Sequence, residues 1–197
     1  MSWPRRLLTF LLGDYELYRV FEVELSDCEV PAAAGIRLAP ITDPQVVLAA
    51  PDSELRTSAA YAGDEALGYG AWVDDELVGV EWVWYGERYR KRNFWPLGAR
   101  DAKSVQTTVA RSHRGRGLAR LLLLYAKADL ARRGFRRVYA RIWHSNAPSV
   151  AVYRRAGWRE IAFVATVYPL GLRRPLRLVF HRRHSRRVRP DSGESAA

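Results

Sequence analysis

The chain is almost without cysteine, since Cys28 is the only one among 197 residues. An intramolecular disulfide is therefore excluded, and a reducing compartment is the default expectation. Histidine is also scarce, and none of the few side chains has the paired spacing of a zinc site. These are His113, His144, His181 and His184. The sequence thus argues against a disulfide-stabilised secreted scaffold, and we expect no metal site.

Long hydrophobic runs are also missing. The longest early apolar stretch, from Leu7 to Leu12 behind Arg5 and Arg6, is interrupted by Thr9 and is far too short to span a bilayer. It also lacks a small-residue cleavage site. We therefore expect no transmembrane segment, no signal peptide and a cytoplasmic protein. A contact of this stretch with a membrane surface is the alternative that stays open.

Lysine is scarce in a strongly basic chain. Only Lys91, Lys103 and Lys127 accompany 29 arginines, and the formal net charge is +11. Such a charge attracts nucleic acid, anionic membranes and phosphorylated cofactors alike. Much of the excess lies in residues 173–189, where a solvated and partly disordered tail is the favoured interpretation. Contact of this tail with nucleic acid or an anionic membrane therefore remains an alternative, and charge alone does not indicate a nucleic-acid-binding protein.

Apolar residues make up 48% of the chain and aromatic residues 12%, which is ample for one packed domain. The patterning predicts strands, then a helix, a strand, a helix and further strands, so the fold class is mixed α/β. The predicted strands cover residues 15–25, 35–40, 67–73, 77–85, 104–111, 137–142, 158–168 and 176–180. The predicted helices cover 118–133 and 148–157, with patchy helical patterning over 44–62 and a loop over 86–100.

The segment from Arg114 to Ala119 follows a predicted strand and opens a predicted helix. Glycine at positions 115 and 117 lets the backbone turn with positive φ and approach a ligand closely. Free amides at the start of the following helix then point outward, which is a typical site for phosphate oxygens. Any mononucleotide or dinucleotide would satisfy such a loop. A glycine-softened turn that binds nothing is the structural alternative.

The segment from Asn146 to Trp158 narrows the choice of ligand. Ser149, Tyr153 and Gly157 follow one another at intervals of four residues, so they lie along one face of a helix that Asn146 opens. This face presents an amide, a hydroxyl and a phenol. The alternative is that Asn146 is a plain N-cap and Tyr153 a core aromatic. Next to a diphosphate loop, the face favours an acyl-coenzyme A (acyl-CoA) site.

Together the two segments resemble the GNAT acetyltransferase superfamily. The coenzyme motif of that family has Arg or Gln, Gly three residues later and Gly or Ala five residues later, which Arg114, Gly117 and Ala119 reproduce. The downstream family motif is matched at every position by Asn146, Ser149, Tyr153, Gly157 and Trp158. The resemblance covers residues 36–170, most strongly 104–158. It implies the GNAT acyl-CoA N-acyltransferase fold, a central mixed sheet flanked by helices and splayed between two parallel strands, 104–111 and 137–142.

On this basis we expect an amino-terminal extension with an extra strand over residues 1–35, a GNAT domain over 36–180 and a basic tail over 181–197. The resemblance implies acetyl-CoA as co-substrate, with no metal. The backbone of Val109 and Arg111 would bind the pantetheine, and the loop amides the pyrophosphate. The residues expected to bind the cofactor are Val109, Arg111, Arg114, Gly115, Arg116, Gly117, Leu118, Ala119, Asn146, Ser149 and Tyr153.

The reaction implied is direct attack of a primary amine on the acetyl carbonyl in a ternary complex, with Tyr153 protonating the departing thiolate. An alkylamine must first lose a proton, which costs about 4 to 5 kcal/mol at pH 7. Glu81 is the best candidate base, although a solvated surface glutamate is the alternative. Relatives that acetylate protein N-termini carry a glutamate five residues before the motif asparagine, where this chain has Arg141.

Arg141 therefore favours an anionic small-molecule amine, such as an amino acid or amino sugar, over a protein N-terminus; a cross-strand salt bridge is the alternative. Trp82 and Tyr85, in an aromatic-rich segment, are expected to contact the acceptor unless they only pack in the core. Two other functions stay open. One is transfer of a longer acyl chain, and the other is a non-catalytic CoA-binding fold used in regulation. Either a monomer or a homodimer is compatible with the sequence.

Overall fold

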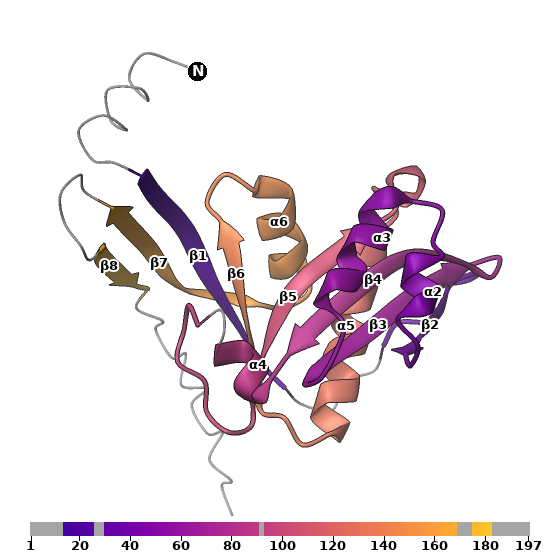
Figure 1. Ribbon diagram of the computed structural model, residues 1–197, viewed down its shortest axis with the longest axis horizontal. Helices are drawn as coiled ribbons and strands as arrows, with labels where there is room; N and C mark the ends of the chain where they lie inside the picture. The colour runs from indigo at the N-terminus through magenta and orange to yellow at the C-terminus, as the bar shows by residue number, and fades with distance from the viewer. Residues whose placement is uncertain (1–13, 26–29, 91–92, 169–174, 183–197) are drawn as a thin grey trace, which may run out of the picture.

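One mixed eight-stranded sheet runs through the computed structural model, which describes residues 14–25, 30–90, 93–168 and 175–182 (Figure 1). The strand order is β2-β3-β4-β5-β6-β1-β7-β8, and β5 and β6 are parallel while every other neighbouring pair is antiparallel. The strands are β1 (Asp14–Glu24), β2 (Arg37–Ile41), β3 (Ala66–Val73), β4 (Glu76–Trp84), β5 (Asp101–Val109), β6 (Arg137–Trp143), β7 (Arg159–Tyr168) and β8 (Leu176–His181). The predicted mixed α/β class is confirmed.

The two parallel strands separate partway along their length. Pairing of β5 with β6 runs from Asp101 opposite Arg137 to Ser104 opposite Ala140 and stops there. Beyond that point β5 continues to Val109 and β6 to Trp143 without pairing to each other. The splay expected between these strands is therefore present (Figure 1).

Strand β1 lies inside the sheet, between β6 and β7, although it comes first in the chain. Its residues pair with β6 from Tyr18 opposite Trp143 to Glu24 opposite Arg137, and with β7 on its other edge. The extra strand expected near the amino terminus thus joins the two carboxy-terminal strands to the rest of the sheet. The expected tail, residues 181–197, lies outside the described residues beyond position 182.

The helices lie on both faces of the half-sheet β2 to β5. In Figure 1, α3 (Ser53–Ser58) lies in front of these strands and α5 (Leu118–Arg132) behind them, and both contact β4. Helix α5 buries Leu118, Leu122 and Ala126, whose spacing of four residues places them on one face. The remaining helices are α2 (Gln45–Leu48), α4 (Gly86–Arg90) and α6 (Ala147–Arg155), with single 3-10 turns at Ala59–Tyr61 and Arg111–His113.

The hairpin of β3 and β4 has the expected short polar turn. Asp74 and Asp75 have φ of 47° and 62°, as in the two-residue turns whose twist matches that of paired strands. Helix α4 corrects the expected loop over residues 86–100. Its first turn is held by a residue distant in the chain, because the Arg88 amide donates to Glu65 Oε2 at 2.8 Å. The side chain of Tyr89, in the same helix, is buried.

A β-bulge interrupts the pairing of β4 with β5. Trp82 lies opposite Gln106, whereas the next residue, Val83, lies opposite Ser104, so Val105 is an extra residue in β5. Such a bulge shifts the alternation of side chains by one position. Ser104 and Thr107, three residues apart, therefore face the same side of the sheet.

No helix in the described parts of the chain is long and apolar enough to cross a membrane.

Candidate functional site

Two cavities meet at the splay between β5 and β6. The larger one has a volume of about 840 Å³ and runs along β5 to the start of α5 and one side of α6. Its lining includes the glycine loop and the first residues of α5. The residues that line it are Glu54, Thr57, Gln106, Thr107, Thr108, Val109, His113, Arg114, Gly115, Gly117, Leu118, Ala119, Arg120, Asn146, Pro148, Ser149, Val152, Tyr153 and Arg155.

The glycine loop has the backbone that a phosphate-binding turn requires. Gly115 and Gly117 both have φ of 80°, and α5 begins immediately afterwards at Leu118. The first amides of an α-helix have no intrahelical acceptor, and they carry the positive end of the helix dipole. The Leu121 amide is the first of α5 bonded back to the loop, to the Gly117 carbonyl at 3.1 Å. The end of the larger cavity at the glycine loop is therefore suited to an anion.

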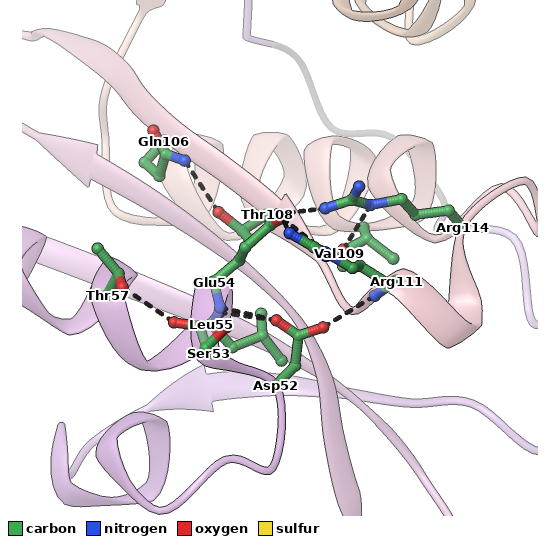
Figure 2. A network of polar contacts seen from close by, with 10 residues as sticks. All are labelled: Asp52, Ser53, Glu54, Leu55, Thr57, Gln106, Thr108, Val109, Arg111 and Arg114. Carbon is green, nitrogen blue, oxygen red and sulfur yellow. Dashed lines mark hydrogen bonds and ion pairs between the residues drawn. The ribbon is translucent and has the colours of Figure 1, made fainter.

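An acidic pair from α3 holds the segment that follows β5 (Figure 2). Asp52 caps α3 by accepting from the Glu54 amide at 2.8 Å, and its second oxygen accepts from the Arg111 amide at 2.9 Å. Glu54 accepts from Arg111 Nη2 at 2.7 Å and also pairs with Arg114. The hydrogen bond from Arg111 is the main cause that lowers the pKa of Glu54. Glu54 is therefore ionised at neutral pH and neutralises part of the charge at the larger cavity.

Most of the residues predicted to bind the cofactor line the larger cavity. Arg111 and Arg116 are the two that do not line it. The Arg111 amide donates to Asp52, and the Val109 carbonyl accepts from Arg114 Nε at 3.1 Å. These two backbone groups, expected to hold the pantetheine, thus have partners within the protein. The predicted residues that do line the larger cavity are Val109, Arg114, Gly115, Gly117, Leu118, Ala119, Asn146, Ser149 and Tyr153.

The smaller cavity, of about 360 Å³, opens on the other side of the splay. Among the described residues, its charged lining side chains are Lys103 and Arg141, and none of the carboxylates lines it. The Arg141 guanidinium lies 5.3 Å from the ring centres of both Tyr18 and Trp143, and 4.0 Å from a carboxylate oxygen of Glu16. The other lining residues are Tyr61, Ser104, Val105, Gln106, Thr107, Ile142, Trp143, Asn146, Ser149 and Tyr153.

The position of Arg141 agrees with both interpretations of it. It is at the smaller cavity, and it also lies near Glu16 of the neighbouring strand β1, although at the limit of a salt bridge. Two cationic side chains, Lys103 and Arg141, thus line the smaller cavity.

Five residues line both cavities and mark their junction. Asn146 opens α6, where its side-chain oxygen accepts from the Ser149 amide at 3.2 Å, so it is an N-cap as well as a lining residue. Tyr153 lies one turn after Ser149 on the same face of α6. The shared residues are Gln106, Thr107, Asn146, Ser149 and Tyr153.

A hydrogen-bonded cluster joins Tyr153 to Glu81 at this junction. The Tyr153 hydroxyl lies 2.6 Å from Ser104 Oγ and 3.2 Å from Thr107 Oγ1. Ser104 donates to Glu81 Oε1 at 2.6 Å and Thr107 donates to Glu81 Oε2 at 2.5 Å. Each carboxylate oxygen of Glu81 is thus bonded to a hydroxyl that is itself next to the phenol.

Glu81 is completely buried, so the solvated alternative considered for it is wrong. Burial raises its pKa to about 8, although the hydrogen bonds from Ser104 and Thr107 act in the opposite direction. A carboxyl group with this pKa can gain and lose a proton near neutral pH. Burial, and after it the negative charge of Glu81, raises the pKa of Tyr153 as well, so the phenol keeps its proton at neutral pH.

Trp82 and Tyr85, predicted to contact the acceptor, line neither cavity. Trp82 is buried against Gly68 of β3, and the Tyr85 ring packs on Phe135 with ring centres 5.4 Å apart. Strand β4 ends at Trp84, so the expected alternation does not extend to Tyr85. These positions agree with the core-packing alternative.

Three residues at the site, Ser104, Thr107 and Glu54, were not predicted from the sequence. Hydroxyl residues are frequent in the strand just before the glycine loop, which was a signal for the first two. Simple alternation would place Ser104 and Thr107 on opposite faces, and the bulge at Val105 that unites them has no mark in the sequence. Among the described residues, no group of three or more histidine, cysteine, aspartate or glutamate side chains could hold a metal ion.

A family model described as the acetyltransferase (GNAT) family matches residues 36–158. No curated protein shows significant similarity to the chain. Among solved structures, a tandem GNAT protein from the clavulanic acid biosynthesis pathway is 24% identical, with a TM-score of 0.52. The match covers 80% of this chain and 55% of that protein.

Two further structures share the fold. A GCN5-related N-acetyltransferase from Sphaerobacter thermophilus is 19% identical, with a TM-score of 0.56, and the match covers 86% of this chain and 57% of that protein. One from Kribbella flavida is 18% identical, with a TM-score of 0.53 and corresponding coverages of 77% and 56%. The chain spans a little over half the length of each of these three proteins.

Proposed function

Because the chain belongs to the GNAT acetyltransferase family, we propose that it transfers the acetyl group of acetyl-CoA to a primary amine of a small molecule. The observation that carries this proposal is the junction of two cavities at Tyr153. The larger cavity ends at the glycine loop, and the smaller one is lined by Lys103 and Arg141. The buried hydrogen-bonded cluster of Glu81 and its hydroxyl partners lies at their junction. The two substrates would thus approach a single point from opposite sides.

The larger cavity fits acetyl-CoA by the chemistry of its residues. The amides of the glycine loop and the start of α5 would hold the pyrophosphate, and a side chain at Gly115 or Gly117 would meet no atom within 4 Å, so the space in front of the loop is open. The amide of Asn146 would hold the pantetheine. When bound, acetyl-CoA supplies the thioester carbonyl that the amine attacks.

Tyr153 would act as the general acid. Its phenol keeps a proton at neutral pH, because burial and Glu81 raise its pKa, and it lies where both cavities open. A positioned acid of this kind stabilises a departing thiolate as negative charge develops on sulfur. The carboxyl group of Glu81, with a pKa of about 8, would take up the proton that the amine must lose.

The acceptor that suits the smaller cavity carries an anionic group besides its amine. Lys103 and Arg141 line this cavity, and no carboxylate in the described part of the chain does, so a carboxylate or phosphate is favoured and a polyamine is disfavoured. An amino acid or an amino sugar with an acidic substituent has this chemistry. The volume of about 360 Å³ is in the range for a small metabolite.

The test is a screen that follows CoA release from acetyl-CoA with three amine classes: amino acids and acidic amino sugars, neutral amines, and polyamines. We expect turnover to be fastest with the anionic class. Tyr153→Phe should lower kcat by about 10- to 100-fold while the Kd for CoA is unchanged. A chain that binds CoA but releases none with any amine would refute the enzymatic proposal, and faster turnover with propionyl-CoA or longer donors would refute the acetyl preference.

A further inference from the structure

Glu81 has no direct access to either cavity. Its side chain is fully buried and lines neither of them, whereas Ser104 lines the smaller one and Thr107 lines both. A base in this position cannot touch an amine in the cavity. Any proton that reaches Glu81 from a substrate must therefore pass through a group that bonds to the carboxylate and also faces the cavity.

We propose that the hydroxyls of Ser104 and Thr107 are a proton relay that connects Glu81 to the amine on one side and to Tyr153 on the other. This inference rests on the proposed function and adds two residues to it. The β-bulge at Val105 makes the arrangement possible, because it turns both hydroxyls toward the same carboxylate.

The distances give each hydroxyl a direction. Thr107 lies at the junction of the cavities and donates to Glu81 at 2.5 Å, whereas its oxygen is 3.2 Å from the phenol. Ser104 is 2.6 Å both from Glu81 and from the Tyr153 oxygen. Thr107 is therefore the entry for the amine proton, and Ser104 is the exit toward Tyr153.

The steps balance over one turnover. The amine forms its bond to the acetyl carbon and gives one proton to the Thr107 oxygen, which passes its own proton to Glu81. The carbon–sulfur bond breaks, and Tyr153 gives its proton to sulfur. The Tyr153 oxygen then takes a proton from Ser104, which recovers one from Glu81. One proton has moved from nitrogen to sulfur, and all four side chains end as they began.

The groups that face Glu81 come from three elements. Ser104 and Thr107 lie on β5 and Tyr153 on α6, while Tyr69 lies opposite Glu81 in the ladder of β3 and β4. The Tyr69 hydroxyl donates to Asp129 of α5 at 3.0 Å, so this phenol is directed at another carboxylate. The relay thus has a single phenol at its end, Tyr153.

The test removes the hydroxyls while keeping the shape of the side chains. Ser104→Ala with Thr107→Val is the relay variant, and Thr107→Ser keeps both hydroxyls. Thr166→Val is the control, since it removes the hydroxyl of a buried threonine on β7, away from both cavities. We expect the relay variant and Glu81→Gln each to lose on the order of 100-fold in kcat. Thr107→Ser is the conservative rescue and should recover most of that loss, whereas the control Thr166→Val should stay within about threefold of the wild-type chain. Every variant should keep the Kd for CoA.

The decisive comparison is the triple variant with Glu81→Gln. If the carboxylate acts only through the hydroxyls, adding Glu81→Gln to the relay variant produces no further loss of kcat. A further tenfold loss, or a relay variant with the wild-type kcat, overturns the proposal.

A second measurement needs no turnover and therefore separates failure of the relay from failure of the proposed function. With labelled glutamate and tyrosine, nuclear magnetic resonance should show the Tyr153 ring signals changing with the ionisation of Glu81 at one shared midpoint. In the relay variant the midpoint of Glu81 should rise, since two hydrogen bonds that lower its pKa are gone, and the Tyr153 signals should no longer follow it. Independent titration of the two groups in the wild-type chain overturns the relay even if acetyl transfer is confirmed.

Discussion

The carboxylate of Glu54 pairs with the guanidinium of Arg114 beside the larger cavity, although Arg114 is among the residues that the sequence predicts to bind the cofactor. Arg111 is bonded to the same carboxylate. An incoming diphosphate would therefore have to compete with Glu54 for these cations. The ion pair lies at the surface, so its strength depends on the salt concentration.

We predict that Glu54→Gln strengthens CoA binding, because it removes the competing negative charge and leaves the arginines available to phosphate. Titration calorimetry should show a Kd about two- to fivefold lower in dilute buffer, with the difference shrinking as salt is added. Glu87→Gln, which removes a surface carboxylate paired with Arg90, is the matched control and should leave the Kd unchanged. Weaker binding of CoA by Glu54→Gln would mean that Glu54 holds Arg114 in a position useful for phosphate.

A second prediction concerns Gly117. Alanine at this position would meet no neighbouring atom but would have to adopt φ of 80°, which costs on the order of 1 kcal/mol of stability. Gly134, at the other end of α5, has φ of 84° and also meets no atom. Gly117→Ala and Gly134→Ala should therefore lower the melting temperature by similar amounts. Only Gly117→Ala should weaken CoA binding, by several-fold, and equal effects of both on the Kd would argue against a phosphate site at the loop.

Strand β5 and its neighbours show which features could be predicted from the sequence. The mixed α/β class and the positions of Tyr153 and Gly117 could be predicted, because they depend on local turn chemistry, on periodicity and on motif spacing, whereas the splay was implied only by the resemblance to the GNAT family. The partners of Glu81 could not. They depend on a bulge at Val105, which follows from how β4 pairs with β5 and not from either strand alone. The short helix α4 was missed for a similar reason, because Glu65, distant in the chain, caps it.

Arg141 gives a third prediction, on acceptor choice. Arg141→Gln should raise the KM for an anionic amine by about 5- to 20-fold, since a charged hydrogen-bond donor at the smaller cavity is lost. The KM for a neutral amine should change little. Arg159→Gln, which removes an arginine paired with Glu22 on the surface, is the control and should affect neither. A proportional loss with both amine classes would make Arg141 a structural residue held by Glu16.

The fourth prediction concerns stability and pH. The pKa of Glu81 is raised from 4.5 to about 8 in the folded protein, so the folded state favours the protonated carboxyl group. Its contribution to stability is complete below the unfolded pKa and is lost as the pH rises through the folded pKa. The wild-type chain should therefore lose stability between about pH 5 and pH 8.

The measurement is urea unfolding of the wild-type chain and of Glu81→Gln across this range. The free energy of unfolding of Glu81→Gln should be less dependent on pH, because its amide does not titrate. Ser58→Ala, which removes another buried polar group, bonded to the Leu55 carbonyl, should keep the wild-type slope. Parallel slopes for Glu81→Gln and the wild-type chain would contradict the raised pKa.

The place of β1 also bears on how the protein is made. Its two neighbours in the sheet, β6 and β7, are synthesised long after it, and the pairing with them occupies both of its edges. On the ribosome, β1 cannot form this pairing until β6 and β7 have emerged, which is after the half-sheet β2 to β5 has been synthesised. Arg141 is on β6 and meets Glu16 and Tyr18 of β1, so the smaller cavity is assembled last. A nascent chain would therefore form its glycine loop before the smaller cavity is complete.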